Sequence, residues 1–148
     1  MRVYLAADHA GFDLKRHLAG QVAAAGYEVV DVGAHEYDPE DDYPAVCFQA
    51  AERVVADPDS LGVVIGGSGN GEQIAANKVR GVRAALVWSV DTARLARRHN
   101  DANVAGIGAR QHTPDEATEM VLAFLGTEFS GEDRHKRRIA IVADYEAG

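Results

Sequence analysis

The stretch GGSGNGEQIAANK, residues 66–78, decides the fold of this chain. It follows Val63-Val64-Ile65, an apolar β-branched run that is typical of a buried parallel strand. It continues into residues 72–78, whose composition favours a helix. The order is therefore strand, loop with four glycines, and helix N-terminus. Glycines let a backbone approach a ligand closely, and free N–H groups at a helix start favour negative charge.

Glu72 stands at the mouth of this anion-binding loop. A carboxylate there can act as a base while the loop amides hold the oxyanion that its chemistry creates. The alternative is an ordinary acid in the first helical turn that balances the helix dipole. A nucleotide site is disfavoured, because the loop matches neither GxxxxGK[ST] nor GxGxxG, whose third glycine would fall at position 72.

Strand-like and helix-like segments alternate along the whole chain. The predicted strands are residues 3–7, 27–32, 61–65, 82–88 and 103–107. The predicted helices are residues 12–25, 44–56, 72–78, 91–99, 114–125 and 132–146, with Asp91 and Thr113 as expected caps. This alternation predicts one α/β domain over residues 1–148, a three-layer α/β/α Rossmann-like fold with a five-stranded parallel sheet and a C-terminal helix.

The unusual residues follow the carboxyl ends of predicted strands, where open parallel sheets bind their ligands. Asp8 and His9 follow the first strand, the glycine loop follows the third, and Arg110 follows the fifth. Taken alone, His9 is more often a hydrogen-bonded structural residue, but the Asp–His pair at a crevice favours binding or proton transfer. The convergence of three strand ends predicts one site.

Composition excludes several classes of function. With 148 residues, 47% of them hydrophobic, the chain can bury a core, and its net charge of −8 argues against general affinity for nucleic acid or an anionic membrane. Apolar runs are too short to span a bilayer, and we expect a cytoplasmic location. Cys47 is the only cysteine, and the six histidines lack metal-binding spacing, so we expect neither a disulfide nor a bound metal.

Basic side chains gather near the C-terminus. Arg134 and Arg138 are four residues apart, so both project from one helix face and can clamp an anion such as a phosphate. A solvated face with internal ion pairs is the alternative. His99 and Asn100 end the fourth predicted helix, where a helix cap and a functional role are about equally compatible with the sequence.

These residues together predict an α/β enzyme with a carboxylate base, an oxyanion loop and an arginine clamp. That set suits proton abstraction beside the carbonyl of a sugar phosphate.

Five ordered segments resemble the ribose-5-phosphate isomerase type B family of sugar-phosphate isomerases (the RpiB/LacA/LacB family). They span nearly the whole chain and read DHAGFDLK (8–15), DDYP (41–44), GGSGNGEQIAANK (66–78), RHNDANVAGIGAR (98–110) and RHKRRI (134–139). The third segment and HNDAN are the specific ones. The resemblance implies an aldose–ketose isomerase of the pentose phosphate pathway that interconverts ribose 5-phosphate and ribulose 5-phosphate through a cis-enediolate. Because loop amides can carry the oxyanion without a metal, we expect activity without a cofactor.

One position departs from the pattern of many family members. They carry a cysteine base just before the glycine loop, where this chain has Gly66. Cys47 belongs to a different predicted element and cannot take that role. In the other subgroup, the resemblance implies that the base is the glutamate after the loop, which corresponds to Glu72 here.

The resemblance also implies roles for individual residues. Glu72 moves the proton, Ser68 shuttles a hydroxyl proton, and His99 helps to open the furanose ring. The residues implied to hold the sugar and the oxyanion are Asp8, His9, Tyr43, Gly67, Ser68, Gly69, Asn70, Gly71 and Asn100. The residues implied to hold the phosphate are His9, Arg110, Arg134 and Arg138, in a site at the interface of a homodimer, or of a dimer of dimers, to which the neighbouring subunit contributes through its C-terminal helix.

Three alternatives stay open at this point. The substrate could be a six-carbon sugar phosphate such as allose 6-phosphate or galactose 6-phosphate, which turnover on both substrate sizes would distinguish. The chain could bind phosphate or nucleotide without chemistry, which tight nucleotide binding without isomerase activity would favour. It could also be a lyase or epimerase using the same enediolate, which product identification by NMR would separate.

Overall fold

Five short apolar segments form one parallel sheet in the order β2-β1-β3-β5-β4 in the computed structural model, which describes residues 1–148. The strands are β1 (Arg2–Ala7), β2 (Glu28–Gly33), β3 (Leu61–Gly66), β4 (Ala84–Leu86) and β5 (Val104–Gly108). The predicted five-stranded parallel sheet is thereby confirmed. The fourth strand is shorter than predicted: β4 pairs only with β5, and the N–H groups of Trp88 and Ser89 donate to the hydroxyl of Thr92 at the start of the next helix.

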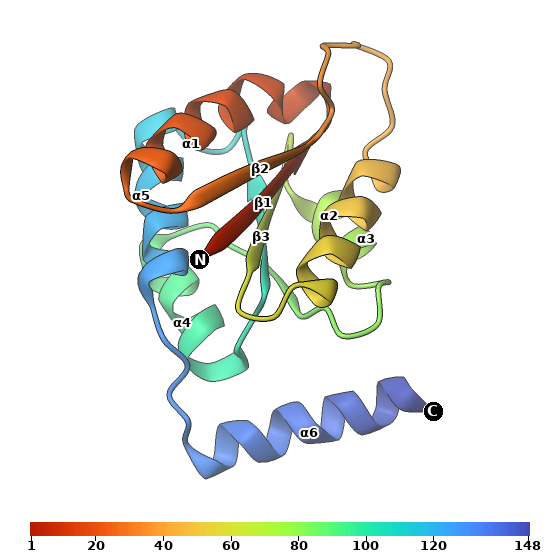
Figure 1. The fold of residues 1–148 in the computed structure, drawn as a ribbon, viewed down its shortest axis with the longest axis vertical. Helices are drawn as coiled ribbons and strands as arrows, with labels where there is room; N and C mark the ends of the chain where they lie inside the picture. The colour runs from red at the N-terminus through yellow and green to blue at the C-terminus, as the bar shows by residue number, and fades with distance from the viewer.

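Helices cover both faces of this sheet, which confirms the three-layer arrangement (Figure 1). The helices are η1 (His9–Gly11), α1 (Phe12–Ala24), α2 (Pro44–Ala56), α3 (Asn70–Ala76), α4 (Val90–Asn100), α5 (Pro114–Gly126) and α6 (Asp133–Ala147). Helices α1, α4 and α5 pack on one face of the sheet, and α2 and α3 pack on the other. Each face therefore has its own apolar core.

The alternation of side chains along the strands divides the core in two. In β1, Val3 and Leu5 join the cluster under α1, α4 and α5, while Tyr4 joins the cluster under α2 and α3. All six residues of β3 are buried, as expected for the central strand of a sheet covered on both sides. This rigid centre fixes the positions at which β1, β3 and β5 end.

Two helix starts show where the cap prediction was right and where it was wrong. Thr113 caps α5 and exchanges hydrogen bonds with Glu116, as the sequence predicted. Asp91 does not cap α4. Instead Ser89 accepts a hydrogen bond from the N–H of Thr92, whose hydroxyl accepts one from the N–H of Ser89 in return. The helix therefore begins earlier than predicted, at Val90.

Helix α6 lies apart from the layers and crosses beneath them in Figure 1. Its far end is held where the Glu146 carboxylate accepts a hydrogen bond of 3.0 Å from the N–H of Gly81. The apolar side chains of Ile141, Val142 and Tyr145 are exposed, and Tyr145 is 90% accessible. This helix thus presents an apolar surface that the rest of its own chain does not cover. None of the helices has the length and apolar character needed to cross a bilayer.

Because all five strands run the same way, the sheet has two distinct edges. We call the side of the sheet at the C-terminal ends of the strands, beyond Ala7, Gly66 and Gly108, the carboxyl edge. The side at which β1, β3 and β5 begin is the amino edge, and neither term refers to the outer strands β2 and β4. Helices α4 and α5 run back against the strands, so α4 ends at the amino edge, just before β5. The predicted site residues divide between these two edges.

Candidate active site

The glycine loop turns sharply at the carboxyl edge between β3 and α3. Gly69 has φ +85°, in the left-handed region, and a Cβ there would come within 2.9 Å of the backbone of Ile107. A Cβ on Gly108 would come within 2.6 Å of the carbonyl oxygen of Ser68. Only glycine fits these two positions. The loop is thereby pressed against the end of β5, as the convergence of the strand ends predicted.

Glu72 lies in the first turn of α3 with its carboxylate folded back onto the end of β3. The side chain is buried, and a Cβ built on Gly66 would overlap the carboxylate. Burial raises the pKa of the Glu72 carboxyl, and the charge of Asp8 raises it further, while the backbone N–H groups of Glu72 and Gly69 partly offset that rise. A carboxylate that has lost water in this way is a stronger base than a solvated one.

Cys47 lies in α2 and is fully buried. Burial raises the pKa of its thiol to about 12, helped by the negative charges of Glu72 and Asp8. The thiol is therefore neutral at physiological pH, and a neutral thiol is a poor base and a poor nucleophile. This agrees with the sequence-based exclusion of Cys47.

Asp8 and His9 directly follow β1 at the same edge. The Asp8 carboxylate is buried and accepts hydrogen bonds from the N–H groups of Ala10 and Gly11 at 3.0 and 3.2 Å. His9 is held from the loop before α2, because Asp41 Oδ1 lies 3.0 Å from its backbone N and 2.8 Å from its Nδ1. With Nδ1 engaged by this carboxylate, Nε2 is the ring nitrogen left to meet a ligand.

Tyr43 and Arg110 frame the glycine loop from two sides. A Cβ on Gly71 would lie 2.5 Å from the Tyr43 ring, and a Cβ on Gly67 would lie 3.1 Å from Nη1 of Arg110. Arg110 is exposed and Tyr43 is half-buried. The loop amides are thus bordered by a phenol on one side and a guanidinium on the other.

Two loop side chains remain exposed, Ser68 and Asn70. The hydroxyl oxygen of Ser68 accepts a hydrogen bond of 3.3 Å from the N–H of Asn70. Both side chains are therefore accessible to a ligand that lies over the loop.

A second group of predicted site residues lies at the amino edge. The residues His99, Asn100 and Arg138 line a groove of about 530 Å³ between α6 and the start of β4. The ring of His99 stacks on that of His135, with centroids 4.4 Å apart, and Nδ1 of His135 lies 2.6 Å from the hydroxyl of Ser130. This stack joins the end of α4 to α6.

Arg134 is exposed on the first turn of α6 and takes part in no ion pair within the chain. Arg138, one turn further along the same helix, is also exposed and unpaired. Both guanidiniums are therefore available to an anion from outside the chain.

The two groups cannot meet within one chain. Glu72 lies at the end of β3, whereas Asn103, three residues past Asn100, accepts a hydrogen bond from Gly62 near the start of β3. Gly62 and Gly66 are separated by roughly 13 Å of extended strand, so Glu72 and the segment that follows His99 lie at opposite ends of β3. One small substrate cannot touch both.

Sequence reasoning missed three residues that support these groups. They are Asp41, which holds His9; His135, which stacks on His99; and Lys15, a fully buried lysine that donates to the Asp31 carboxylate at 2.8 Å and to the Ala34 carbonyl. All three lie in segments that resemble the family, DDYP, RHKRRI and DHAGFDLK, so the resemblance could have drawn attention to them. No local sequence pattern specified which residues they contact.

Asp8, His9 and Asp41 also offer ligand atoms within 4.8 Å of one another. Oδ1 of Asp8 already accepts hydrogen bonds from the N–H groups of Ala10 and Gly11, and Oδ1 of Asp41 accepts one from the N–H of His9. The arrangement is that of a hydrogen-bonded support for His9, and the absence of a bound metal stays a prediction.

Comparisons with known proteins agree with this geometry. The sequence model of the Ribose/Galactose Isomerase family matches residues 3–142. The "Ribose-5-phosphate isomerase B" of Mycolicibacterium paratuberculosis is 60% identical over 146 residues, which cover 99% of this chain and 92% of that protein.

Two solved structures share the fold over nearly their full length. The ribose-5-phosphate isomerase B of Mycoplasma genitalium, solved with bound ribulose 5-phosphate, is 41% identical with a TM-score of 0.95, and the match covers 99% of this chain and 96% of that one. The enzyme of Clostridium thermocellum is 40% identical with a TM-score of 0.94, over 99% and 98% of the two chains. A match of this extent in both sequence and fold places the chain in the Ribose/Galactose Isomerase family.

Proposed function

We propose that this chain interconverts D-ribose 5-phosphate and D-ribulose 5-phosphate, with Glu72 as the base and without a metal or cofactor. A relative that is 60% identical over the full chain is named for this reaction, and a structural neighbour binds ribulose 5-phosphate. The site adds a buried carboxylate beside a glycine loop in which the N–H groups of Gly67, Ser68 and Gly71 have no acceptor within the chain and can receive an oxyanion.

The observation that carries the choice of base is the overlap between Gly66 and Glu72. The Glu72 carboxylate occupies the space that any side chain at position 66 would need. A cysteine base at position 66 and a glutamate in this pose exclude each other. This supports the glutamate-base subgroup.

The reaction follows from these positions. The Glu72 carboxylate removes the proton from C2 of the open-chain aldose, and the electron pair moves to the C1 carbonyl oxygen, which becomes the oxyanion of a cis-enediolate. The N–H groups of residues 67–71 stabilise that oxyanion. Ser68 passes the proton of the C2 hydroxyl to the C1 oxygen. Glu72 then returns its proton to C1, which completes the ketose, and losing one oxyanion donor would cost ~10²–10³ in rate.

The remaining roles require a second copy of the chain. His99 and Asn100 open the ring and hold sugar hydroxyls, and Arg134 and Arg138 bind the phosphate together with His9 and Arg110. Because the two groups lie at opposite edges of the sheet, His99, Asn100 and the α6 arginines reach the site from the neighbouring subunit of a homodimer, which has a two-fold interface. The exposed apolar side chains of α6 support this assembly.

The test is a ribose 5-phosphate isomerisation assay with EDTA present, on the wild type and on Glu72→Gln. We expect metal-independent turnover in the wild type and a loss of roughly 10³-fold or more in the variant, since general-base removal alone accounts for 10²–10⁴. Substrate binding, measured by calorimetry, should remain in the variant. Full turnover in Glu72→Gln would exclude Glu72 as the base.

The family name also covers galactose isomerases, so six-carbon substrates belong in the same assay. Allose 6-phosphate and galactose 6-phosphate should turn over more slowly than ribose 5-phosphate. NMR identification of the product separates an isomerase from an epimerase or lyase. Nucleotide binding without turnover of any sugar phosphate would indicate a binding module instead.

A further inference from the structure

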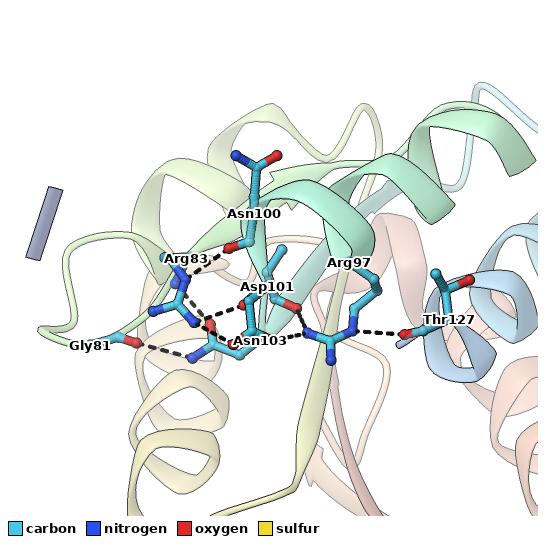
Figure 2. Close-up of polar contacts among 8 residues, drawn as sticks. Gly81, Arg83, Arg97, Asn100, Asp101, Asn103 and Thr127 are labelled. Carbon is cyan, nitrogen blue, oxygen red and sulfur yellow. Dashed lines mark hydrogen bonds and ion pairs between the residues drawn. The ribbon is translucent and has the colours of Figure 1, made fainter. Parts of the chain in front are cut away.

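We propose that Arg83, acting with Arg97 and Asp101, is a positioning residue that fixes the end of α4 so that His99 and Asn100 meet the substrate. Figure 2 shows this network at the amino edge of the sheet. The inference rests on the proposed role of His99 and Asn100, and it extends that role to residues that contact no substrate.

The end of α4 needs external support. The last carbonyl groups of a helix have no partner within it, and here the final helical residues are the exposed His99 and Asn100. The following residue, Asp101, has φ +44°, in the left-handed region that favours glycine. The N–H groups of Asp101, Ala102 and Ser130 satisfy the carbonyls of the preceding turn, so the exposed carbonyls of His99 and Asn100 are the ones left without a partner from the cap. A contact to the Asn100 carbonyl from outside the helix would hold the last turn, and with it the direction of His99.

Arg83 supplies these contacts from the start of β4. Its Nε donates to the carbonyl of Asn100 at 3.0 Å, and its Nη2 donates to the carbonyl of Asp101 at 2.7 Å. A guanidinium suits this place, because its fixed fork binds two acceptors and its charge opposes the negative end of the helix dipole. Arg83 also lines the same groove as His99 and Asn100.

Arg97 holds the same turn from the other side (Figure 2). Its Nη1 donates to Oδ1 of Asp101 at 2.9 Å and to the carbonyl of Ala102 at 2.6 Å, and its Nε donates to the carbonyl of Thr127 at 3.3 Å. The guanidinium lies 5.8 Å from the ring centre of the buried Phe124. Arg97 therefore ties the end of α4 to α5 and the core.

Asp101 and Asn103 join the two arginines into one unit. The second carboxylate oxygen of Asp101 lies 3.5 Å from Arg83 Nη2. Asn103 accepts from the backbone N–H of Arg83 at 2.7 Å and donates to the carbonyl of Gly81 at 3.0 Å, which fixes the strand that carries Arg83. Every hydrogen bond of the Arg83 guanidinium goes to a backbone carbonyl of the α4 end, which a merely solvating surface arginine would not do.

The test separates positioning of His99 from general damage by comparing two reactions of the same enzyme. Turnover of ribose 5-phosphate requires ring opening. Exchange of the C1 hydrogen of ribulose 5-phosphate with D₂O requires Glu72 and the oxyanion loop but no ring opening, because that ketose cannot close a furanose ring through its phosphorylated C5 oxygen. NMR measures both rates.

For Arg83→Met, we expect turnover of ribose 5-phosphate to fall about tenfold or more, because small misplacements of a catalytic group cost up to 10²-fold, while C1 exchange changes much less. Asp101→Asn, which tolerates the left-handed backbone, should shift the same ratio less strongly. Arg94→Met is the matched control, an exposed arginine of α4 without a polar partner in the chain, and should leave both rates unchanged.

His99→Ala serves as the reference variant. If it lowers turnover but not exchange while Arg83→Met and Asp101→Asn affect neither, the positioning role is excluded and the proposed function stands. Equal losses of both rates in Arg83→Met, with Asp101→Asn unchanged, would also exclude it and indicate a structural role. If His99→Ala itself leaves the ratio unchanged, the ring-opening role of His99 is wrong, and the positioning role fails with it.

Discussion

At the scale of single residues, Glu72 carries two opposing demands. As the proposed base, its carboxylate must be charged to accept a proton, yet it is buried beside a second carboxylate, Asp8, and its pKa is raised for both reasons. The same burial that strengthens the base also disfavours its charged form in the folded state. Catalysis therefore costs stability at this residue.

This cost has a defined dependence on pH. The pKa of Glu72 is higher in the folded than in the unfolded protein, so the folded protein holds this proton more tightly. The contribution of Glu72 to stability therefore declines as pH rises from the unfolded pKa through the folded pKa. We predict that Glu72→Gln raises Tm at pH 7–8, by about 2–4 °C for each kcal/mol relieved, and changes it little near pH 4.

Thermal unfolding followed by circular dichroism across this pH range measures the effect. Glu36→Gln, at an exposed glutamate, is the control and should show no such trend. A Glu72→Gln variant that is less stable than wild type at pH 8 would contradict the prediction.

At the scale of elements, the loop from β2 to α2 positions His9 from a distance of 32 residues. Asp41, which lies in this loop, holds the His9 ring. Lys15 holds the start of the loop by donating a hydrogen bond to the Ala34 carbonyl. A loop held at both points places the His9 ring reproducibly at the carboxyl edge.

We predict that Asp41→Asn raises KM for ribose 5-phosphate by about 2–10-fold, the equivalent of one hydrogen bond of 0.5–1.5 kcal/mol, with kcat nearly unchanged. The reason is that the neutral amide of this variant lacks the negative charge that orients the His9 ring for the phosphate. Steady-state kinetics on this variant and on Asp42→Asn, at the exposed neighbour, provide the check. A fall in kcat at constant KM would place His9 in the chemical step instead.

The elements also show what the sequence could and could not predict. Strand and helix periodicity predicted every layer, and the strand ends predicted that Asp8, the glycine loop and Arg110 converge, because parallel topology alone brings those ends together. The end of β4 and the start of α4 were misplaced, because Trp88 and Ser89 donate their N–H groups to the Thr92 hydroxyl of the α4 cap and Ser89, not Asp91, caps the helix. Local sequence propensity does not determine which of two nearby polar residues caps a helix.

Contacts between distant side chains lay beyond the sequence. Nothing in the residues near His9 indicates Asp41, and nothing near Gly66 specifies that the Glu72 carboxylate folds back over it. Both depend on a rotamer and a loop path that the packed structure determines. The sequence showed only that position 66 lacks the cysteine seen in many family members. The structure shows why a glycine is needed there: the Glu72 carboxylate occupies the space of a side chain.

At the scale of the whole molecule, the proposed site is divided between the two edges of the sheet, and this proposal requires an oligomer as the active unit. Glu72→Gln and His99→Ala should each be inactive alone. In a mixed dimer, one site carries both defects and the other carries none. We predict that mixing the two variants under exchange conditions restores about one quarter of wild-type activity, since half of the randomly assembled dimers are mixed.

The control mixes Glu72→Gln with Ser68→Ala, two changes at the same edge, which should restore nothing. Recovery in this control would show that Glu72 and Ser68 of one active site come from different subunits. No recovery in the first mixture, despite subunit exchange confirmed by native mass spectrometry, would rule out the shared site.

The placement of Glu72 against Gly66 has a consequence for how this isomerase tolerates oxidants. A cysteine base, which the resemblance implies for many members of the family, depends on a reactive thiolate that peroxide and alkylating reagents attack. Here the only thiol is buried and neutral, and the proposed base is a carboxylate, which is not on the oxidation pathway of a thiol. We expect full activity after treatment with iodoacetamide or hydrogen peroxide at doses that inactivate a cysteine-base isomerase. Replacing a thiol with a carboxylate would then let pentose interconversion continue under oxidative stress.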